Sequence, residues 1–256
     1  MNTARLFPAS TQGNGYEGRC YIGHPACRSW LAEALDQPWP RQPLTLVIPP
    51  LDEPGLALLQ PLLRLLISQE RGPETELALN DWGALYFCRE FLDALALPWQ
   101  MTAGLLLAEQ HTDPLLPQFL RPADQRRSIW HQGQRAELAW VPPSPELQAH
   151  WQYPGVFAKV ELLKQLGVSR LELCSQPLAW PQQGPGLPVT FYGQRALLSV
   201  SPCPGRDDPA ARRCPGCLAL PPQSQRGGQT LHADRNLLYY QLDTPAPAWA
   251  DRLVAW

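Results

Sequence analysis

The sequence predicts an α/β fold in which the strands form a parallel sheet, either open or closed into a barrel. Three observations predict it. Short apolar runs recur along the chain, and most are continuous rather than alternating, as in strands covered on both faces. Helix-like stretches lie between these runs. One helix pattern stops at a glycine and turns at once into an apolar strand, which is the order of an αβ unit.

Six segments have the composition of buried strands, and an earlier short piece, "CYIG" (20–23), also resembles a strand. Apolar and β-branched residues dominate all of them, and turn-forming residues bound them. The six are "LTLVIPP" (44–50), "ELALN" (76–80), "WQMTAGLLL" (99–107), "SRLELCS" (169–175), "LPVTFYG" (187–193) and "ALLSVSP" (196–202).

Three stretches have helical spacing. Residues 54–69 are apolar nearly all round, as in a helix packed deep against a sheet, and Pro61 is expected to kink or split that helix. Residues 82–95 follow Asp81, a natural N-cap. Residues 155–166 stop at Gly167. The tail from residue 232 reads as a strand, a proline break and a short terminal helix.

Composition favours one domain spanning residues 1–256. A chain of 256 residues that is 45% hydrophobic can bury a large core, and no boundary is visible along it. The 30 prolines are spread between apolar runs, which indicates proline-rich loops in a compact fold rather than disorder. A net charge of -2 gives no basic surface for phosphate contacts, so nucleic acid is not an expected partner.

Localisation is predicted to be cytoplasmic. The first residues contain no apolar leader segment, and the longest apolar runs fall well short of the ~18 residues that a membrane span requires. An odd number of cysteines, 7, without a leader favours a reducing compartment, where clustered cysteines are more often ligands or redox groups than disulfides.

Common hydrolase and nucleotide-binding motifs are missing from the sequence. There is no G-x-S-x-G, H-E-x-x-H, P-loop or G-x-G-x-x-G signature, so no protease nucleophile or base is indicated. The 5 histidines are scattered, and only His24 is notable, because it lies close to Cys27.

Chemistry is instead indicated by a loop rich in proline and glycine, "SPCPGRDDPAARRCPGC" (201–217). It follows directly on an apolar strand and carries Cys203, Cys214 and Cys217 in a C-x10-C-x2-C pattern. Functional groups gather on loops after the carboxyl ends of parallel strands, and thiolates there can bind zinc or an iron–sulfur cluster. The alternative is three unbound surface thiols, which would be prone to oxidation.

A fourth ligand is needed, and Cys27 is the best candidate because it follows the turn after the "CYIG" strand. Cys20 lies within that strand. Cys174 is near a strand end but inside a strong strand pattern, so both remain open as replacements for Cys27. Cys88 lies on the apolar face of a helix and is predicted to be a core residue.

Four segments resemble the U32 peptidase-like family, most closely its UbiV-like branch of accessory proteins in oxygen-independent ubiquinone biosynthesis. They are "CYIGHPACRSW" (20–30), "ELALNDWGALYFCRE" (76–90), "GVSRLELCSQPL" (167–178) and "YGQRALLSVSPC" (192–203), in the family's order. The gaps between the late cysteines are shorter here than in that branch, and a first β/α unit is expected to be trimmed.

The resemblance implies a TIM-barrel-like domain with a 4Fe–4S cluster on Cys27, Cys203, Cys214 and Cys217. It implies oxygen-independent hydroxylation of a small molecule or quinone precursor, in a heterodimer with a related, UbiU-like protein, and no peptidase activity. Two alternatives stay open. A structural zinc site on the same cysteines would indicate a scaffold or partner-binding protein. Other members of the family hydroxylate RNA bases.

Overall fold

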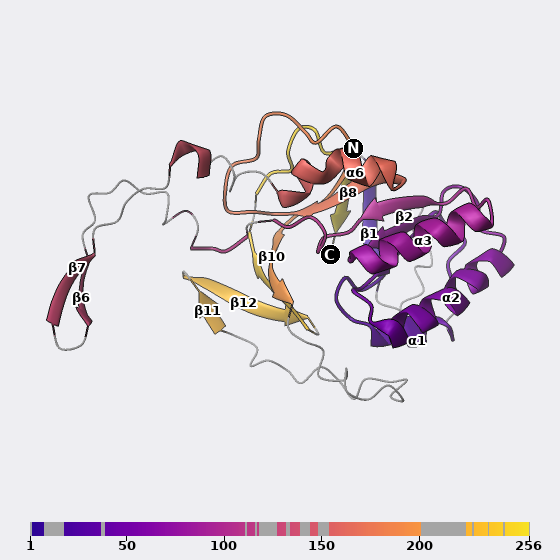
Figure 1. Ribbon diagram of the computed structural model, residues 1–256, viewed down its shortest axis with the longest axis horizontal. Helices are drawn as coiled ribbons and strands as arrows, with labels where there is room; N and C mark the ends of the chain where they lie inside the picture. Colours follow the sequence, from indigo (N-terminus) through magenta and orange to yellow (C-terminus); the bar gives the residue numbers. More distant parts are fainter. Residues whose placement is uncertain are drawn as a thin grey trace.

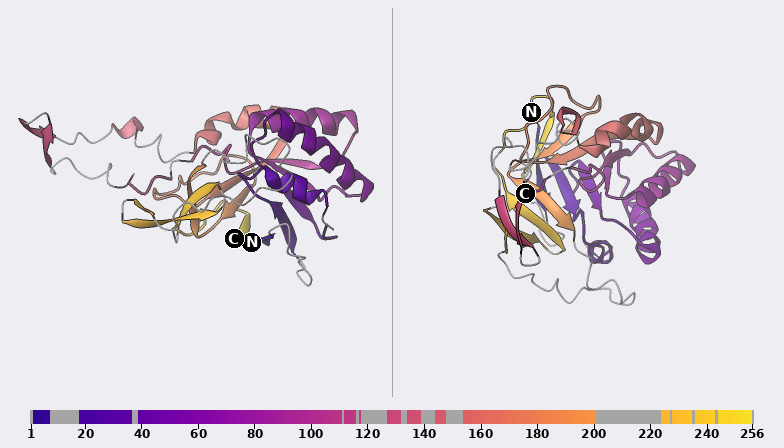
Figure 2. Two further views of the ribbon diagram at one scale, coloured as in Figure 1. Left: turned by 90° about the horizontal axis from the view of Figure 1, so that it is seen from below. Right: turned by 60° about the vertical axis from the view of Figure 1, so that its left-hand side comes forward.

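The computed structural model (Figure 1) combines parallel strands, helices packed on them and a smaller antiparallel sheet. The helices gather on one side of the parallel strands and the antiparallel sheet lies on another, as Figure 2 also shows. The residues that the structure describes are 2–7, 18–36, 39–110, 112–115, 117, 127–131, 134–138, 144–147, 154–200, 224–226, 228–234, 236–242 and 244–255.

The parallel strands form one curled sheet whose strand order closes on itself: β1-β14-β9-β8-β5-β4-β3-β2. Every neighbouring pair in this ring is parallel. The strands are β1 (Asn2–Phe7), β2 (Arg19–Gly23), β3 (Leu44–Ile48), β4 (Glu76–Leu79), β5 (Gln100–Ala103), β8 (Val168–Cys174), β9 (Val189–Tyr192) and β14 (Arg252–Ala255).

Among the described residues, helices alternate with strands between β2 and β8. In that part of the chain come α1 (Ser29–Ala34), α2 (Glu53–Ser68), α3 (Trp82–Ala94), and the 3-10 turn η1 (Gly155–Lys159) leading into α6 (Val160–Gln165). The predicted mixed α/β fold with a curled parallel sheet is therefore confirmed as a partial β/α barrel. Within the described residues, no helix separates β8 from β9, so the regular alternation of a TIM barrel is not reproduced.

Helix starts and stops follow local signals in the sequence. Asp52 and Asp81 cap α2 and α3, and their side chains accept hydrogen bonds from the backbone N–H of Gly55 and Ala84. The segment after α6 turns at Gly167, where φ is +83° and a residue with a side chain would be strained. Pro61 was expected to kink or split α2; it does not split the helix, because α2 runs unbroken from Glu53 to Ser68.

The main core lies between the helices and the outer face of the curled sheet. Leu59, Leu62, Leu63 and Leu66 of α2 are fully buried there. Their burial explains why α2 stays continuous through Pro61: each fully buried leucine contributes roughly 1.5–3 kcal/mol, comparable to the ~3 kcal/mol penalty of an interior proline. No helix among the described residues combines the length and apolarity that a membrane crossing demands.

A second, antiparallel sheet corrects the prediction for residues 196–202. That segment was expected as a further barrel strand, but β10 (Arg195–Val200) leaves the barrel and pairs with β13 (Leu237–Gln241). The sheet continues through β12 (Gln229–Asp234) to β11 (Ser224–Arg226). A separate hairpin of β6 (Arg127–His131) and β7 (Gln134–Leu138) projects away from the barrel (Figure 1).

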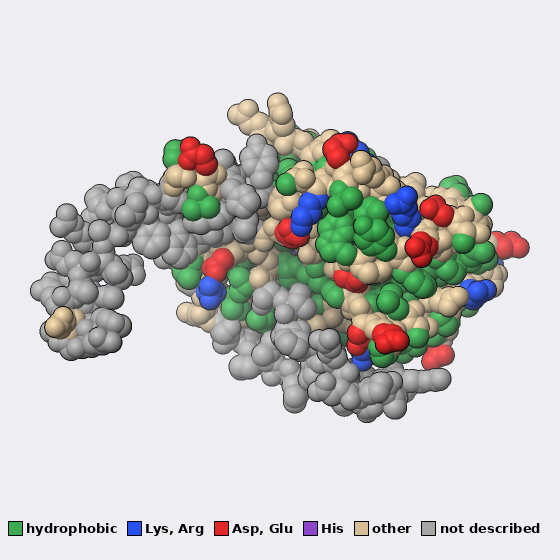
Figure 3. Space-filling model, viewed as in Figure 1, with side chains coloured by type: hydrophobic (Ala, Val, Ile, Leu, Met, Phe, Trp, Pro, Cys, Tyr) green, Lys and Arg blue, Asp and Glu red, His purple; other side chains and the backbone are tan. Residues whose placement is uncertain are grey.

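The tail gives a second correction. A terminal helix was predicted, but Arg252–Ala255 is a strand, β14, which inserts between β1 and β9 and closes the ring. A four-residue segment has little conformational preference of its own, so the two neighbouring strands decide its state. On the face shown in Figure 3, acidic and basic side chains are interspersed rather than gathered by sign.

Candidate functional site

The four cysteines predicted as metal ligands divide into two groups. Cys27 is described, whereas Cys203, Cys214 and Cys217 lie outside the described residues. The four-cysteine ligand set therefore stays a prediction. Within the described part of the chain, no group of three or more His, Cys, Asp or Glu residues is arranged to hold a metal ion.

Cys27 lies in the loop that joins β2 to α1, at the carboxyl end of β2. The turn into this loop requires a glycine: Gly23 has a φ of +126°, and a Cβ there would lie 2.3 Å from the carbonyl oxygen of Val47. His24 then turns back on the loop, and its Nδ1 accepts from the N–H of Ala26 at 3.1 Å. The Cys27 thiol is 1% exposed and lies 3.1 Å from the hydroxyl of Ser29.

The antiparallel sheet holds both ends of the segment with the other three cysteines, and one turn of this sheet contacts the Cys27 loop. Before the segment, Val200 pairs with Leu237. After it, Ser224 pairs with Leu231, three residues from the end of β12. The turn between β12 and β13 contacts the Cys27 loop, because Asn236 Nδ2 donates to the carbonyl of Ala26 at 2.7 Å. On that turn, Asp234 Oδ1 is 3.8 Å from His24 Nε2.

The other three described cysteines are buried in two different parts of the fold. Cys20 and Cys88 belong to the core between the sheet and the helices. Cys174 lies inside the barrel, where the backbone N–H of Leu197 is 3.4 Å from its sulfur. Burial raises the pKa of all three thiols, that of Cys174 to about 12. They therefore remain protonated thiols, which are poor metal ligands unless the metal itself displaces the proton.

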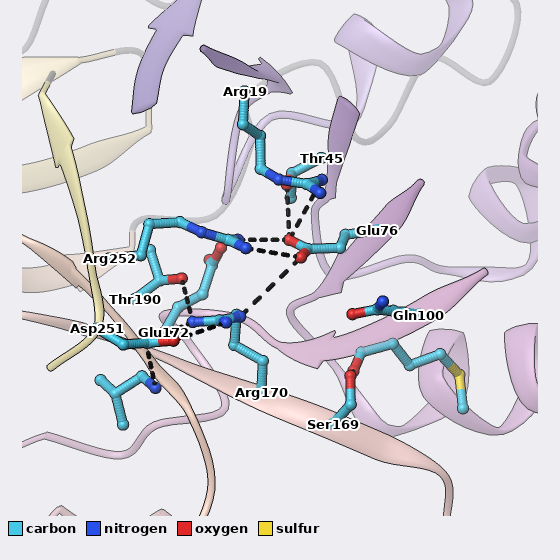
Figure 4. Close-up of polar contacts among 12 residues, drawn as sticks. Arg19, Thr45, Glu76, Gln100, Ser169, Arg170, Glu172, Thr190, Asp251 and Arg252 are labelled. Carbon is cyan, nitrogen blue, oxygen red and sulfur yellow. Dashed lines mark hydrogen bonds and ion pairs between the residues drawn. The ribbon is translucent and has the colours of Figure 1, made fainter. Parts of the chain in front are cut away.

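Sequence reasoning missed a cluster of polar side chains inside the barrel (Figure 4). We call it the lumen cluster. Barrels of this type are usually filled by branched apolar residues, so buried charges here indicate a specific role, in stability or in binding. Its members come from β2, β3, β4, β8, β9 and β14: Arg19, Tyr21, Thr45, Glu76, Arg170, Glu172, Thr190, Tyr192 and Arg252.

Glu76 is the ionised centre of the lumen cluster. Arg252 binds it with two hydrogen bonds of 2.7 and 2.9 Å, and the hydroxyl of Thr45 donates at 2.9 Å. The guanidinium groups of Arg19 and Arg170 lie 3.6 and 4.0 Å away. Burial alone would raise the pKa of Glu76, but the hydrogen bonds and charge of Arg252 outweigh it and hold this pKa below its usual value.

Glu172 is the second carboxyl group of the lumen cluster, and its pKa is shifted in the opposite direction to that of Glu76. It is 1% exposed and accepts a hydrogen bond from the hydroxyl of Tyr192 at 3.1 Å. Burial raises its pKa to about 8, and the charge of Glu76 adds to this, while Tyr192, Arg252 and Arg170 act against it. At neutral pH, Glu172 is thus mainly an uncharged carboxylic acid.

A sequence signal for the lumen cluster existed. In "SRLELC", charged residues occupy alternate positions between leucines, and "ELAL" begins with a charged residue in an otherwise apolar run. A strand covered on its outer face by helices has only its inner face for such residues, because side chains alternate between faces. Glu76, Arg170 and Glu172 could therefore have been assigned to the lumen.

Comparisons with known proteins do not identify a family for this chain: no family model, no curated protein and no solved structure matches it. Its function is therefore inferred from the residues and their placement.

Proposed function

We propose that this chain is an iron–sulfur protein that carries a 4Fe–4S cluster on Cys27, Cys203, Cys214 and Cys217. Its role would be that of the UbiV-like branch of the U32 peptidase-like family: oxygen-independent hydroxylation in anaerobic ubiquinone biosynthesis. In this proposal the substrate is a quinone precursor, the partner is a related protein of that family, and the complex acts in the cytoplasm.

The placement of the Cys27 loop is the observation that supports the proposal most. Cys203 comes three residues after Val200, and three residues span at most about 10 Å. Val200 pairs with Leu237, next to Asn236, which is hydrogen-bonded to Ala26. Chain connectivity thus allows Cys203 to reach the neighbourhood of Cys27 although 175 residues separate them in the sequence.

The chemistry of the donor set also supports a cluster. Cysteine thiolates are the usual ligands of iron–sulfur clusters, and such clusters are tuned by solvent exposure. Cys27 is almost fully buried at the carboxyl end of a parallel strand, where β/α barrels carry their functional groups. When bound, the cluster would supply electron transfer for the hydroxylation.

Metal analysis under anaerobic conditions tests the cofactor. We expect about four iron and four sulfide per chain, with the absorbance of an iron–sulfur protein. Cys27→Ala should lose the cluster, whereas Cys174→Ala, also a buried thiol at a strand end, should keep it. Cys88→Ala controls for the loss of a buried sulfur in the core.

Two results would contradict this assignment. One zinc per chain without sulfide would instead identify the structural zinc site. Loss of iron in Cys174→Ala but not in Cys27→Ala would mean that Cys174 is the fourth ligand.

The pathway is tested separately by deleting the gene and profiling quinones and modified nucleosides from anaerobic cells. The amount of ubiquinone should fall. A loss of hydroxylated RNA bases alone would assign the chain to the RNA-modifying members of the family.

A further inference from the structure

Two buried polar atoms inside the barrel have no hydrogen-bond partner among the described residues: Oε2 of Glu172 and Oγ1 of Thr102. The two residues are 1% and 0% exposed. Nearly all buried polar atoms in proteins are hydrogen-bonded, to the protein or to ordered water, because an unpaired one is strongly destabilising. Two unpaired atoms in one interior space therefore indicate a missing partner.

Strand register places both side chains in the lumen. Thr102 on β5 is the pairing partner of Ala78 on β4 and of Arg170 on β8. Glu172 follows Arg170 by two residues and so shares its face of the sheet. Diagonal neighbours of this kind on adjacent strands lie roughly 7–8 Å apart at Cα, so Glu172 and Thr102 are near neighbours in the lumen.

A bulge in β8 produces this arrangement. Met101 pairs with Val168 and Thr102 with Arg170, so Ser169 is an extra residue without a counterpart on β5. Val168 consequently packs in the outer core, while Arg170 and the two alternate residues after it turn inward. Bulges commonly redirect side chains next to functional sites.

The space is closed toward the carboxyl ends of the strands by apolar side chains. Leu105 is 4% exposed and packs with Ala78, Tyr192 and other lumen residues, and Leu197 packs against them. The charged groups that face Glu172 are Glu76, Arg170 and Arg252, and the titratable neutral ones are Tyr21 and Tyr192. Small Ala78 lies beside Thr102.

The hydrogen bonds of Glu172 show which kind of partner its Oε2 atom lacks. Tyr192 donates to Oε1, so the proton of the neutral acid lies on Oε2, which then needs an acceptor. Thr102 Oγ1 can both donate and accept. A water molecule satisfies both atoms, since buried waters make two to four hydrogen bonds.

We propose that the barrel interior contains a binding site for one water molecule, held between Oε2 of Glu172 and Oγ1 of Thr102. This inference does not depend on the proposed iron–sulfur function. It concerns the lumen alone and is argued only from residues that the structure describes.

Thr102→Val tests the site, because the direction of its effect depends on the water. With the water present, the substitution removes one of its partners and leaves Glu172 less satisfied, so the folding equilibrium constant at pH 6 should fall about tenfold. Without the water, it removes an unpaired buried hydroxyl and the constant should rise or stay unchanged. Thr75→Val is the matched control, since Thr75 is also a buried threonine without a partner for its hydroxyl but does not contribute to the pair formed by Glu172 and Thr102.

A crystal structure of the wild-type chain at a resolution that shows ordered water provides the direct test. We expect density for one water within hydrogen-bond distance of Glu172 Oε2 and Thr102 Oγ1. A dry lumen, or a Thr102→Val variant that is as stable as Thr75→Val or more stable than wild type, would overturn the proposal. If Thr102→Val does not fold, the wild-type density alone decides.

Discussion

Glu76 and Glu172 show how one barrel interior can hold two carboxyl groups in opposite protonation states. Both are buried, but Glu76 receives two hydrogen bonds from Arg252, whereas Glu172 receives one, from the neutral hydroxyl of Tyr192. Hydrogen bonds from a charged donor stabilise the carboxylate, while desolvation favours the neutral acid. A pair of carboxyl groups with separated pKa values can bind and release a proton near neutral pH.

Glu172 should make the protein less stable as the pH rises. Its pKa goes from an ordinary 4.5 to about 8 on folding, so between these values the unfolded chain has released a proton that the folded chain still binds. The free energy of unfolding therefore falls across that window, by at most about 4–5 kcal/mol. Urea unfolding of wild type and Glu172→Gln at pH 5.5 and 8.5 measures this.

Glutamine keeps the shape of Glu172 and its hydrogen bond from Tyr192 but cannot ionise. The Glu172→Gln variant should accordingly lose most of the pH dependence between 5.5 and 8.5. The lowered pKa values of Glu76 and Asp251 do not interfere, because stability from such groups is lost only as the pH falls below about 4. Equal slopes for both proteins would show that Glu172 is ionised throughout.

Removing the charge of Glu76 should destabilise the fold strongly. Glu76→Gln leaves Arg252, whose side chain is 11% exposed, without a buried counter-ion, and losing one partner of such a pair costs about 3–5 kcal/mol. Glu161→Gln is the matched control: its pair with Lys164 is exposed, and the loss should stay below about 0.5 kcal/mol. Comparable urea midpoints for the two variants would contradict a structural role for Glu76.

At the scale of the elements, the bulge in β8 determines which side chains of this strand point into the lumen. Ser169 is the unmatched residue, so its deletion should remove the bulge and leave Arg170, Glu172 and Cys174 on the lumen side. Deleting Leu171 instead should turn Glu172 and Cys174 toward the apolar outer core, because a shift of one residue reverses the faces of a strand. We expect the chain without Ser169 to fold cooperatively and the chain without Leu171 to be insoluble.

Circular dichroism and thermal unfolding of the two single-residue deletions make this comparison. The deletions are well matched, since they lie two positions apart in one strand and each shortens the chain by one residue. If both proteins fold equally well, the direction in which β8 side chains point is not what determines stability here.

The same elements show what the sequence could predict. β3, β4, β8 and β9 were recognised because continuous apolar runs between turn residues identify buried strands. β1 and β14 were missed because each takes its conformation from pairing with a strand more than 200 residues away along the chain, which no local pattern reveals. The fate of β10 was also decided by pairing, with β13, which no local pattern reveals.

For the site, the loop after β2 was predicted correctly as the place of Cys27, because a strand followed by glycine and proline marks a strand end. The lumen cluster was not predicted, since it forms from one or two residues on each of six strands. Which of these residues meet depends on barrel closure and on the β8 bulge.

At the scale of the whole molecule, β14 connects the N-terminal strand β1 and the C-terminal residues of the chain to the polar cluster inside the barrel. It pairs with β1 and β9, and its first residue supplies the guanidinium that binds Glu76 on β4. A chain that ends at Asp251 would therefore have two unpaired strand edges and a buried Glu76 without its main partner. We expect it to keep helical structure but to unfold without a cooperative transition and to expose apolar surface, as measured by far- and near-ultraviolet circular dichroism.

Arg252→Met separates the two contributions of β14, since it removes the charge but keeps the backbone of the strand. This variant should unfold cooperatively with reduced stability, and combining it with Glu76→Gln should restore part of the loss, because neither buried charge then lacks a partner. If the chain ending at Asp251 instead unfolds as cooperatively as Arg252→Met, the barrel does not require β14 for closure. The contribution of β14 would then be confined to the ion pair with Glu76.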